Sequence, residues 1–125
     1  MILEIRTYRL RPGTGEEFVR VMREESVPLL REAGLRVIAC GPSLAGDGDE
    51  EEAYLMRAFD SLEQRERQEE SFYSSDVWRH GPREAVVSRI ESMHTIVVES
   101  ADVAVAALEA QHGDGQNGID RNGEE

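Results

Sequence analysis

Four short segments constrain the fold of this chain most strongly, because each has apolar side chains at both alternating positions of a strand. The segments are Ile2–Leu10, Leu35–Cys40, Ala53–Phe59 and Ser88–Glu99. Successive side chains of a strand point to opposite faces of a sheet, so neighbours such as Val37 and Ile38 place apolar groups on both faces. The sequence therefore predicts a sheet that is buried on both sides.

Two helical segments separate these strands. Residues 14–17 (TGEE) have the spacing of a capping box, and the apolar stripe that follows ends at Gly34. Pro28 lies inside this stripe and is expected to kink or split the helix, because it removes a backbone hydrogen bond. The second helix is highly charged and is expected to begin with Asp60 or Ser61 as its N-cap.

The order strand, helix, strand, strand, helix, strand predicts an α+β fold, the ferredoxin-like βαββαβ antiparallel sheet with its helices on one face. In that topology the first strand lies between the third and the fourth. The second apolar face is then left uncovered, which favours pairing of two sheets into a homodimeric α+β barrel. We expect residues 1–100 to form this domain, residues 101–111 to add a short helix, and residues 112–125 to be disordered.

The composition narrows the class of protein. Of the 125 residues, 39% are hydrophobic and 32% charged, and the net charge of −12 makes nucleic acid and anionic membranes poor partners. No apolar run approaches the roughly 20 residues that span a bilayer, and Glu4 and Arg6 interrupt the N-terminus before a signal sequence could form. Because Cys40 is the single cysteine, no internal disulfide is expected, and we predict a cytoplasmic location.

Polar side chains on the central strands indicate a site in the cleft between the sheet and the helices. The candidate ligand-binding residues are Arg6, Tyr8, Tyr54, Arg57 and His94. The two arginines are suited to hold a carboxylate or enolate oxygen, and His94 to exchange a proton near neutral pH. The same pattern also has an ordinary structural explanation. In it the arginines pair across strands with Glu4 and Glu91, and His94 is a hydrogen-bonded residue of the sheet.

Other motifs are less specific. An aromatic cluster of Phe72, Tyr73 and Trp78 is expected either in the core or as the wall of a pocket for a planar ligand. The acidic loop 43–52 lacks the spacing of a calcium loop, and the three histidines lack metal-ligand spacing. We therefore predict neither a metal site nor a cofactor.

Three motifs give the chain a resemblance to one family. They are ExRTY at residues 4–8 ahead of Pro12-Gly13, YxxRxFDSL at residues 54–62, and FYxSDxWRxGPRE at residues 72–84. With these motifs the chain resembles the NIPSNAP family, within the dimeric α+β barrel superfamily, over about residues 2–100. Animal members carry mitochondrial transit peptides, and the missing Arg-rich leader indicates a bacterial-type version.

The resemblance does not single out a reaction, because the family has no settled enzymatic activity. Relatives with the same fold include cofactor-free monooxygenases, haem-degrading enzymes, lactone isomerases and dimeric ligand binders. The resemblance implies a homodimeric module that binds a small apolar or aromatic molecule or another protein. The alternative is a cofactor-independent monooxygenase or isomerase acting on an aromatic or polyketide-like substrate, with His94 as general base and an arginine stabilising an oxyanion. A purely structural role in a larger assembly is a third hypothesis.

Overall fold

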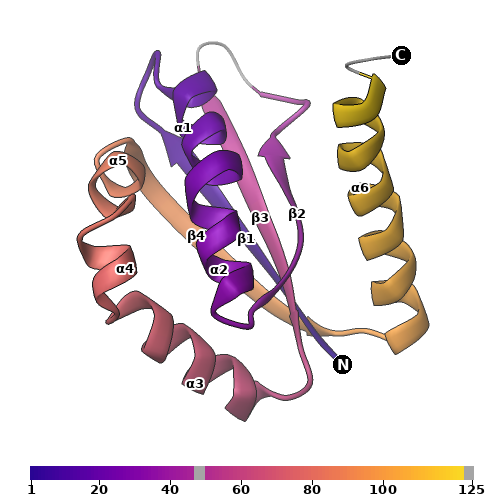
Figure 1. The fold of residues 1–125 in the computed structure, drawn as a ribbon. Coiled ribbons are helices and arrows are strands. Elements are labelled where there is room, and N and C mark those ends of the chain that lie inside the picture. The colour runs from indigo at the N-terminus through magenta and orange to yellow at the C-terminus, as the bar shows by residue number, and fades with distance from the viewer. Residues whose placement is uncertain (47–49, 123–125) are drawn as a thin grey trace.

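The computed structural model describes residues 1–46 and 50–122, with side chains described as far as His112, and these residues form one four-stranded antiparallel sheet flanked by helices (Figure 1). The strands are β1 (Ile2–Leu10), β2 (Arg36–Pro42), β3 (Glu51–Phe59) and β4 (Ile90–Glu99). Their order across the sheet is β2-β3-β1-β4. The predicted ferredoxin-like fold is confirmed, including the place of β1 between β3 and β4.

One face of the sheet is covered by two groups of helices. The first group is α1 (Gly15–Val21), the π-helical segment η1 (Met22–Ser26) and α2 (Val27–Glu32), and the second is α3 (Leu62–Tyr73), α4 (Asp76–Arg79) and α5 (Arg83–Val87). The main core lies between these helices and the sheet, with Phe18, Leu30, Leu55 and Phe72 all almost completely buried. Both crossovers therefore return over the same side, as the topology requires.

The first helical segment contains a π-helical turn directly before Pro28. In η1 the amide of Val27 donates to the carbonyl of Met22, five residues back, where an α-helix would use a spacing of four. The ring of Pro28 would otherwise clash with the carbonyl of Glu24, four residues before it. The predicted split at Pro28 is thus confirmed, and it takes the form of a widened turn.

The two ends of this helical segment are held differently from each other. Gly34 has φ of +92° and ends α2 in a Schellman motif, as predicted, with hydrogen bonds from Gly34 N–H to Arg31 and from Leu35 N–H to Leu30. The predicted capping box at residues 14–17 is wrong, because the side chain of Thr14 donates to the carbonyl of Arg11 and caps nothing.

A carboxylate from another strand takes over the cap of α1. Glu51 of β3 accepts hydrogen bonds from the amides of Gly13 and Gly15 at the start of the helix. At α3 the local prediction is confirmed, since Ser61 accepts from the amide of Gln64. Sequence spacing found the cap that is local and missed the cap that tertiary structure supplies.

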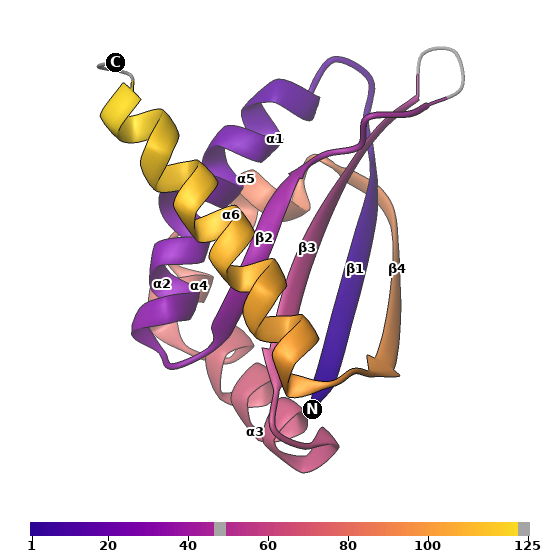
Figure 2. The same ribbon diagram turned by 90° about the vertical axis from the view of Figure 1, so that its right-hand side faces the viewer.

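A last helix, α6 (Asp102–Asn122), lies on the opposite face of the sheet from α1–α5 (Figure 1). It crosses in front of β2 and the end of β3 and leaves β1 and β4 uncovered beside it (Figure 2). Val105 is fully buried there against Leu3, Ile38 and Ala58, and Glu109 forms an ion pair with Arg36 at 2.7 Å. The chain itself therefore covers part of the face for which the sequence pattern predicts a partner.

The helix at the C-terminal end is longer than the 101–111 segment expected from the sequence. The prediction of disorder for residues 112–125 stays a prediction, and its last three residues lie outside the described part of the chain. The division into a domain at residues 1–100 and a separate tail is likewise untested. Within the described side chains, α6 is joined to the sheet by both apolar and charged contacts.

The rest of this face carries apolar side chains in the open. Ile96 and Val98 of β4 are 46% and 41% exposed. They lie opposite Ile5 and Leu3 of β1 in the strand register. Together these residues form an apolar strip along β1 and β4, next to the edge of α6.

We expect Val105→Asp to lower the free energy of unfolding by about 2–3 kcal/mol, because it buries a carboxylate without a partner. Chemical denaturation of the folded protein measures this loss. Val103→Asp is the matched control, since Val103 lies on the same helix and is 76% exposed. An equal, small effect of the two substitutions would show that α6 does not pack as described.

Candidate functional site

The strand register divides the five predicted site residues between the two faces of the sheet. Thr7 of β1 lies opposite Tyr54 on β3 and opposite His94 on β4. All three side chains belong to the face that carries α6, where Tyr54 packs against the apolar cluster around Val105 and His94 is exposed. Tyr54 and His94 therefore do not reach a site between the sheet and helices α1–α5.

The remaining three predicted residues do share the helix-covered face. Arg6 and Tyr8 alternate with Thr7, and Arg57 lies opposite Glu4 of the same strand face. The structure does not bring all five residues together on one face, because residues 54 and 57 are three positions apart on one strand and an odd spacing points them to opposite faces.

A buried cluster of charged side chains joins β1, β3 and α3. We call this set the charged cluster; its members are Glu4, Arg6, Arg57, Arg65 and Glu69. Glu4 and Arg57 are fully buried and are bridged at 2.7 Å, and Arg65 reaches the other oxygen of Glu4, also at 2.7 Å. Each strand thus contributes a charge that the other strand or the helix neutralises.

The structural explanation of Arg6 and Arg57, in which they form ion pairs with carboxylates of neighbouring strands, is confirmed in part. Arg57 pairs with Glu4 across strands, as expected, and Arg6 approaches the same carboxylate at 3.8 Å. The second carboxylate is Glu69 of α3 and not Glu91, which is exposed. Strand alternation could not identify Glu69, because its approach depends on how α3 lies across the sheet.

Arg6 connects the charged cluster to an adjacent cavity. One of its terminal nitrogens lies 3.4 Å from Glu69, and the other donates to the hydroxyl of Tyr73 at 3.4 Å. That hydroxyl also accepts from Arg57 at 2.8 Å. Arg6 and Tyr73 both line the cavity, so the polar end of the cavity is held in place by the cluster.

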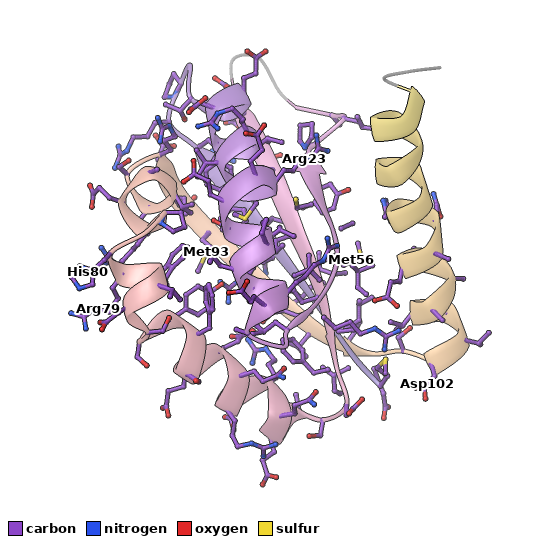
Figure 3. All side chains as sticks on the ribbon, in the orientation of Figure 1. Arg23, Met56, Arg79, His80, Met93 and Asp102 are labelled. Atoms are coloured by element: carbon purple, nitrogen blue, oxygen red, sulfur yellow. The ribbon has the colours of Figure 1, made fainter. Side chains whose placement is uncertain are left out.

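The cavity has a volume of about 190 Å³ and is mostly apolar. Its apolar walls come from the sheet, α2 and α5, and they include Leu30, Leu55, Val86, Val87 and Ile90. Met93 of β4 lies opposite Tyr8 in the register and lines the cavity from the edge strand. Figure 3 shows Met93 on the side of α4 and α5, whereas Met56 lies on the side of α6.

The aromatic cluster belongs both to the core and to the cavity wall. Phe72 and Trp78 are buried in the main core, with ring centroids 5.6 Å apart, and Tyr73 packs edge-on against Trp78 at 5.2 Å. Trp78 and Tyr73 also line the cavity. The two interpretations left open by the sequence are therefore compatible.

Two residues that line this cavity each have a buried polar atom without a hydrogen-bond partner. Among the side chains that the structure describes, the Nε atom of Arg6 and the Oγ atom of Ser26 are the buried atoms without a hydrogen bond, and both residues line the cavity. Ser26 is 1% exposed and ends the π-helical segment η1. Buried polar groups in proteins are nearly always paired, so two unpaired atoms on residues that line one cavity call for an explanation.

Ser26 was missed in the sequence, although a signal existed. It interrupts a row of buried side chains spaced by four residues, Phe18, Met22 and Leu30. A hydroxyl on the inward stripe of a helix normally bonds to a carbonyl of the preceding turn. The π-helical turn changes that spacing here, and such turns are frequent at functional sites.

The two buried carboxyl groups titrate very differently. Burial acts to raise the pKa of Glu4, but a hydrogen bond with Glu69 and the charges of Arg57 and Arg6 outweigh it and lower the pKa to about 2. Burial, together with the hydrogen bond and the negative charge of Glu4, raises the pKa of Glu69 to about 7. Below a pH of about 7 the folded pair therefore holds a proton, which resides mainly on Glu69.

We expect the free energy of unfolding to fall by on the order of 2 kcal/mol as the pH rises from about 4.5 to about 7. The folded protein retains the proton of Glu69 in this range, whereas in the unfolded chain the group has its ordinary pKa of 4.5 and has released it. Folding therefore binds a proton, and raising the pH opposes it. Denaturation curves at several pH values measure the slope.

Glu69→Gln should flatten this slope, since glutamine cannot titrate and can still donate to Glu4. Glu70→Gln is the control, because Glu70 is the next residue of α3 and is exposed. Identical pH profiles for the two variants would contradict the assignment. The loss of stability at lower pH, as Glu4 is protonated, should remain in both.

The described residues do not indicate a metal site, a membrane-spanning helix or a nucleophilic cysteine. Among the side chains described for residues 1–46 and 50–112, no three from His, Cys, Asp or Glu come close enough together to hold a metal ion. Within residues 1–46 and 50–122, no helix is both long and apolar enough to cross a membrane. Cys40 is a buried free thiol whose pKa is raised by burial, so it is unsuited to act as a nucleophile.

Comparisons with known proteins agree with this fold. One solved structure, an uncharacterized NIPSNAP domain protein from Burkholderia xenovorans, shares 22% identity over 82% of this chain and 96% of its own, with a TM-score of 0.70. A NIPSNAP family protein from Agrobacterium tumefaciens shares 24% sequence identity over 81% of this chain and 93% of its own, with a TM-score of 0.67. A putative antibiotic biosynthesis monooxygenase from Nitrosomonas europaea shares 16% sequence identity over 80% of this chain and 98% of its own, with a TM-score of 0.57.

These structural similarities establish the fold and not an activity. A comparison with curated proteins found no match. The sequence model of the NIPSNAP family, however, matches residues 3–104, which extend from β1 across both groups of helices to the start of α6. The chain belongs to the NIPSNAP family.

Proposed function

We propose that this protein is a homodimeric module that binds a small single-ring molecule in the cavity between the sheet and helices α1–α5. One observation carries the proposal: the two unpartnered buried polar atoms belong to residues that line the same mostly apolar cavity. Ligand sites commonly combine an apolar lining with a few polar groups that fix orientation. A ligand oxygen would provide the partner that Arg6 and Ser26 do not have within the protein.

The volume limits the size of the ligand. An apolar cavity of about 150 Å³ is sufficient to hold benzene. The cavity of about 190 Å³ therefore suits one ring with a short substituent. Val87 and Met93 are 42% and 52% exposed and line the cavity, so the opening lies between α5 and the edge strand β4.

The lining favours binding over acid–base catalysis. Among the described residues that form it there is no histidine, aspartate, glutamate or cysteine. Burial raises the pKa of the Tyr8 hydroxyl, which makes it a poor base at neutral pH. His94, the general base of the oxygenase or isomerase alternative, is exposed on the opposite face. That alternative is supported by similarity of fold alone.

The dimer is proposed to form through the apolar strip on β1 and β4. Ile96 and Val98 lie in the open on this strip, next to Ile5, while α6 covers the rest of the same face. Pairing two such strips about a two-fold axis would bury each against its copy. Because α6 occupies β2 and part of β3, the contact would be smaller than one between two bare sheets.

We expect neutral single-ring compounds such as toluene and benzamide to bind in the cavity and to raise the melting temperature by several degrees. At ten times Kd the stabilisation is about 1.4 kcal/mol. Trp78 is the only tryptophan of the chain and lines the cavity, so its fluorescence reports occupancy directly. Val87→Phe should weaken binding at least about tenfold by narrowing the opening.

The matched control is Val77→Phe, on exposed α4 surface away from the lining. It should bind the probes like the unmodified protein. Absence of binding in the unmodified protein, or equal loss in both variants, would overturn the proposed cavity function.

The dimer has its own test. Ile96→Asp should convert a dimer at micromolar concentration into a monomer in sedimentation experiments, because the two-fold axis would place two unpaired carboxylates in one apolar contact. Val77→Asp, on the helix-covered side, should remain dimeric. A monomeric mass for the unmodified protein would refute this part of the proposal.

A further inference from the structure

The charged cluster has one positive charge in excess. It contains three arginines, Arg6, Arg57 and Arg65, and two carboxylates, Glu4 and Glu69. Four of these five side chains are no more than 15% exposed, and Arg65 is 23% exposed. When Glu69 holds a proton, the excess rises to two. Uncompensated charge away from water is costly, so the cluster favours a nearby anion.

The excess charge adjoins the cavity at Arg6. Arg6 is the only arginine among the described residues that line the cavity. Its two terminal nitrogens are engaged by Glu69 and Tyr73, and its Nε atom is unpartnered. A guanidinium N–H without a partner is a strong donor to an oxyanion. Ser26 supplies the second unpartnered donor.

We propose that the ligand of this cavity is a single-ring organic monoanion, whose carboxylate or equivalent oxyanion accepts hydrogen bonds from Arg6 Nε–H and Ser26 Oγ–H. This inference rests on the proposed binding function and specifies its ligand class. The ring lies against Trp78 and the apolar walls, and the anionic end neutralises the charge excess. The apolar ring thus contacts the apolar walls, and the oxyanion contacts the polar end of the cavity.

Three probes separate the contributions of ring and charge. Benzoate has both, benzamide keeps the ring without the charge, and acetate keeps the charge without the ring. Isothermal titration calorimetry should give benzoate at least about a tenfold lower Kd than benzamide, as expected for hydrogen bonds to a charged acceptor. Benzoate should also bind more tightly than acetate, by at least about tenfold for the buried ring.

Two substitutions test which residues bind the carboxylate of the ligand. Ser26→Ala should weaken benzoate about tenfold and leave benzamide within about threefold, because it removes one charge-assisted hydrogen bond. Arg6→Gln should remove the preference for benzoate over benzamide. The matched control is Arg65→Gln, since Arg65 contacts the same carboxylates and does not line the cavity. It should weaken the preference clearly less than Arg6→Gln does, because it removes the excess charge of the cluster but keeps the hydrogen bond at the cavity.

The outcomes distinguish this inference from the proposed function. If benzamide binds as tightly as benzoate, the anion assignment is wrong and the cavity function stands. If acetate matches benzoate, the ring assignment is wrong. If Arg65→Gln abolishes the preference as Arg6→Gln does, the effect is one of general charge and the assignment to Arg6 fails. Should Arg6→Gln not fold, Ser26→Ala alone decides, and an unchanged Kd for benzoate refutes the proposal.

Discussion

The buried ion pair between Glu4 and Arg57 is the interaction on which the rest of this structure depends. It joins the two central strands across the face that the helices cover, and Arg65 and Glu69 of α3 complete it. Removing one partner would leave the other buried without compensation, at a cost of about 3–5 kcal/mol. The pair therefore fixes where α3 crosses the sheet, and with it the position of Tyr73 and the polar end of the cavity.

Two local irregularities involve residues that line the cavity. The π-helical turn before Pro28 places Ser26 on the inward side of its helix without a partner. The odd number of arginines in the charged cluster leaves Arg6 incompletely paired on the neighbouring strand. A regular helix would satisfy the serine, and one more carboxylate would satisfy the arginine. Both features cost stability in the protein alone, and the proposed binding role would account for that cost.

Much of the fold could be predicted, because strand alternation and turn residues are local signals. The strand order, the break at Pro28, the end of α2 at Gly34 and the cap at Ser61 all follow from short-range chemistry. The α1 cap was missed because Glu51, which supplies it, is distant in sequence. The site was predicted only in part: Arg6, Tyr8 and Arg57 share a face, whereas Tyr54 and His94 lie on the other.

The sequence by itself determined the family, the antiparallel sheet and the presence of apolar side chains on both of its faces, since these depend on residue types and their periodicity. Only the tertiary structure decided what covers each face. It assigned α1–α5 to one side and α6 to part of the other, and it brought Glu69 to Arg6 and Ser26 to the same cavity as Arg6. Such contacts depend on how helices cross the sheet, and crossing geometry is set by packing that no short segment encodes.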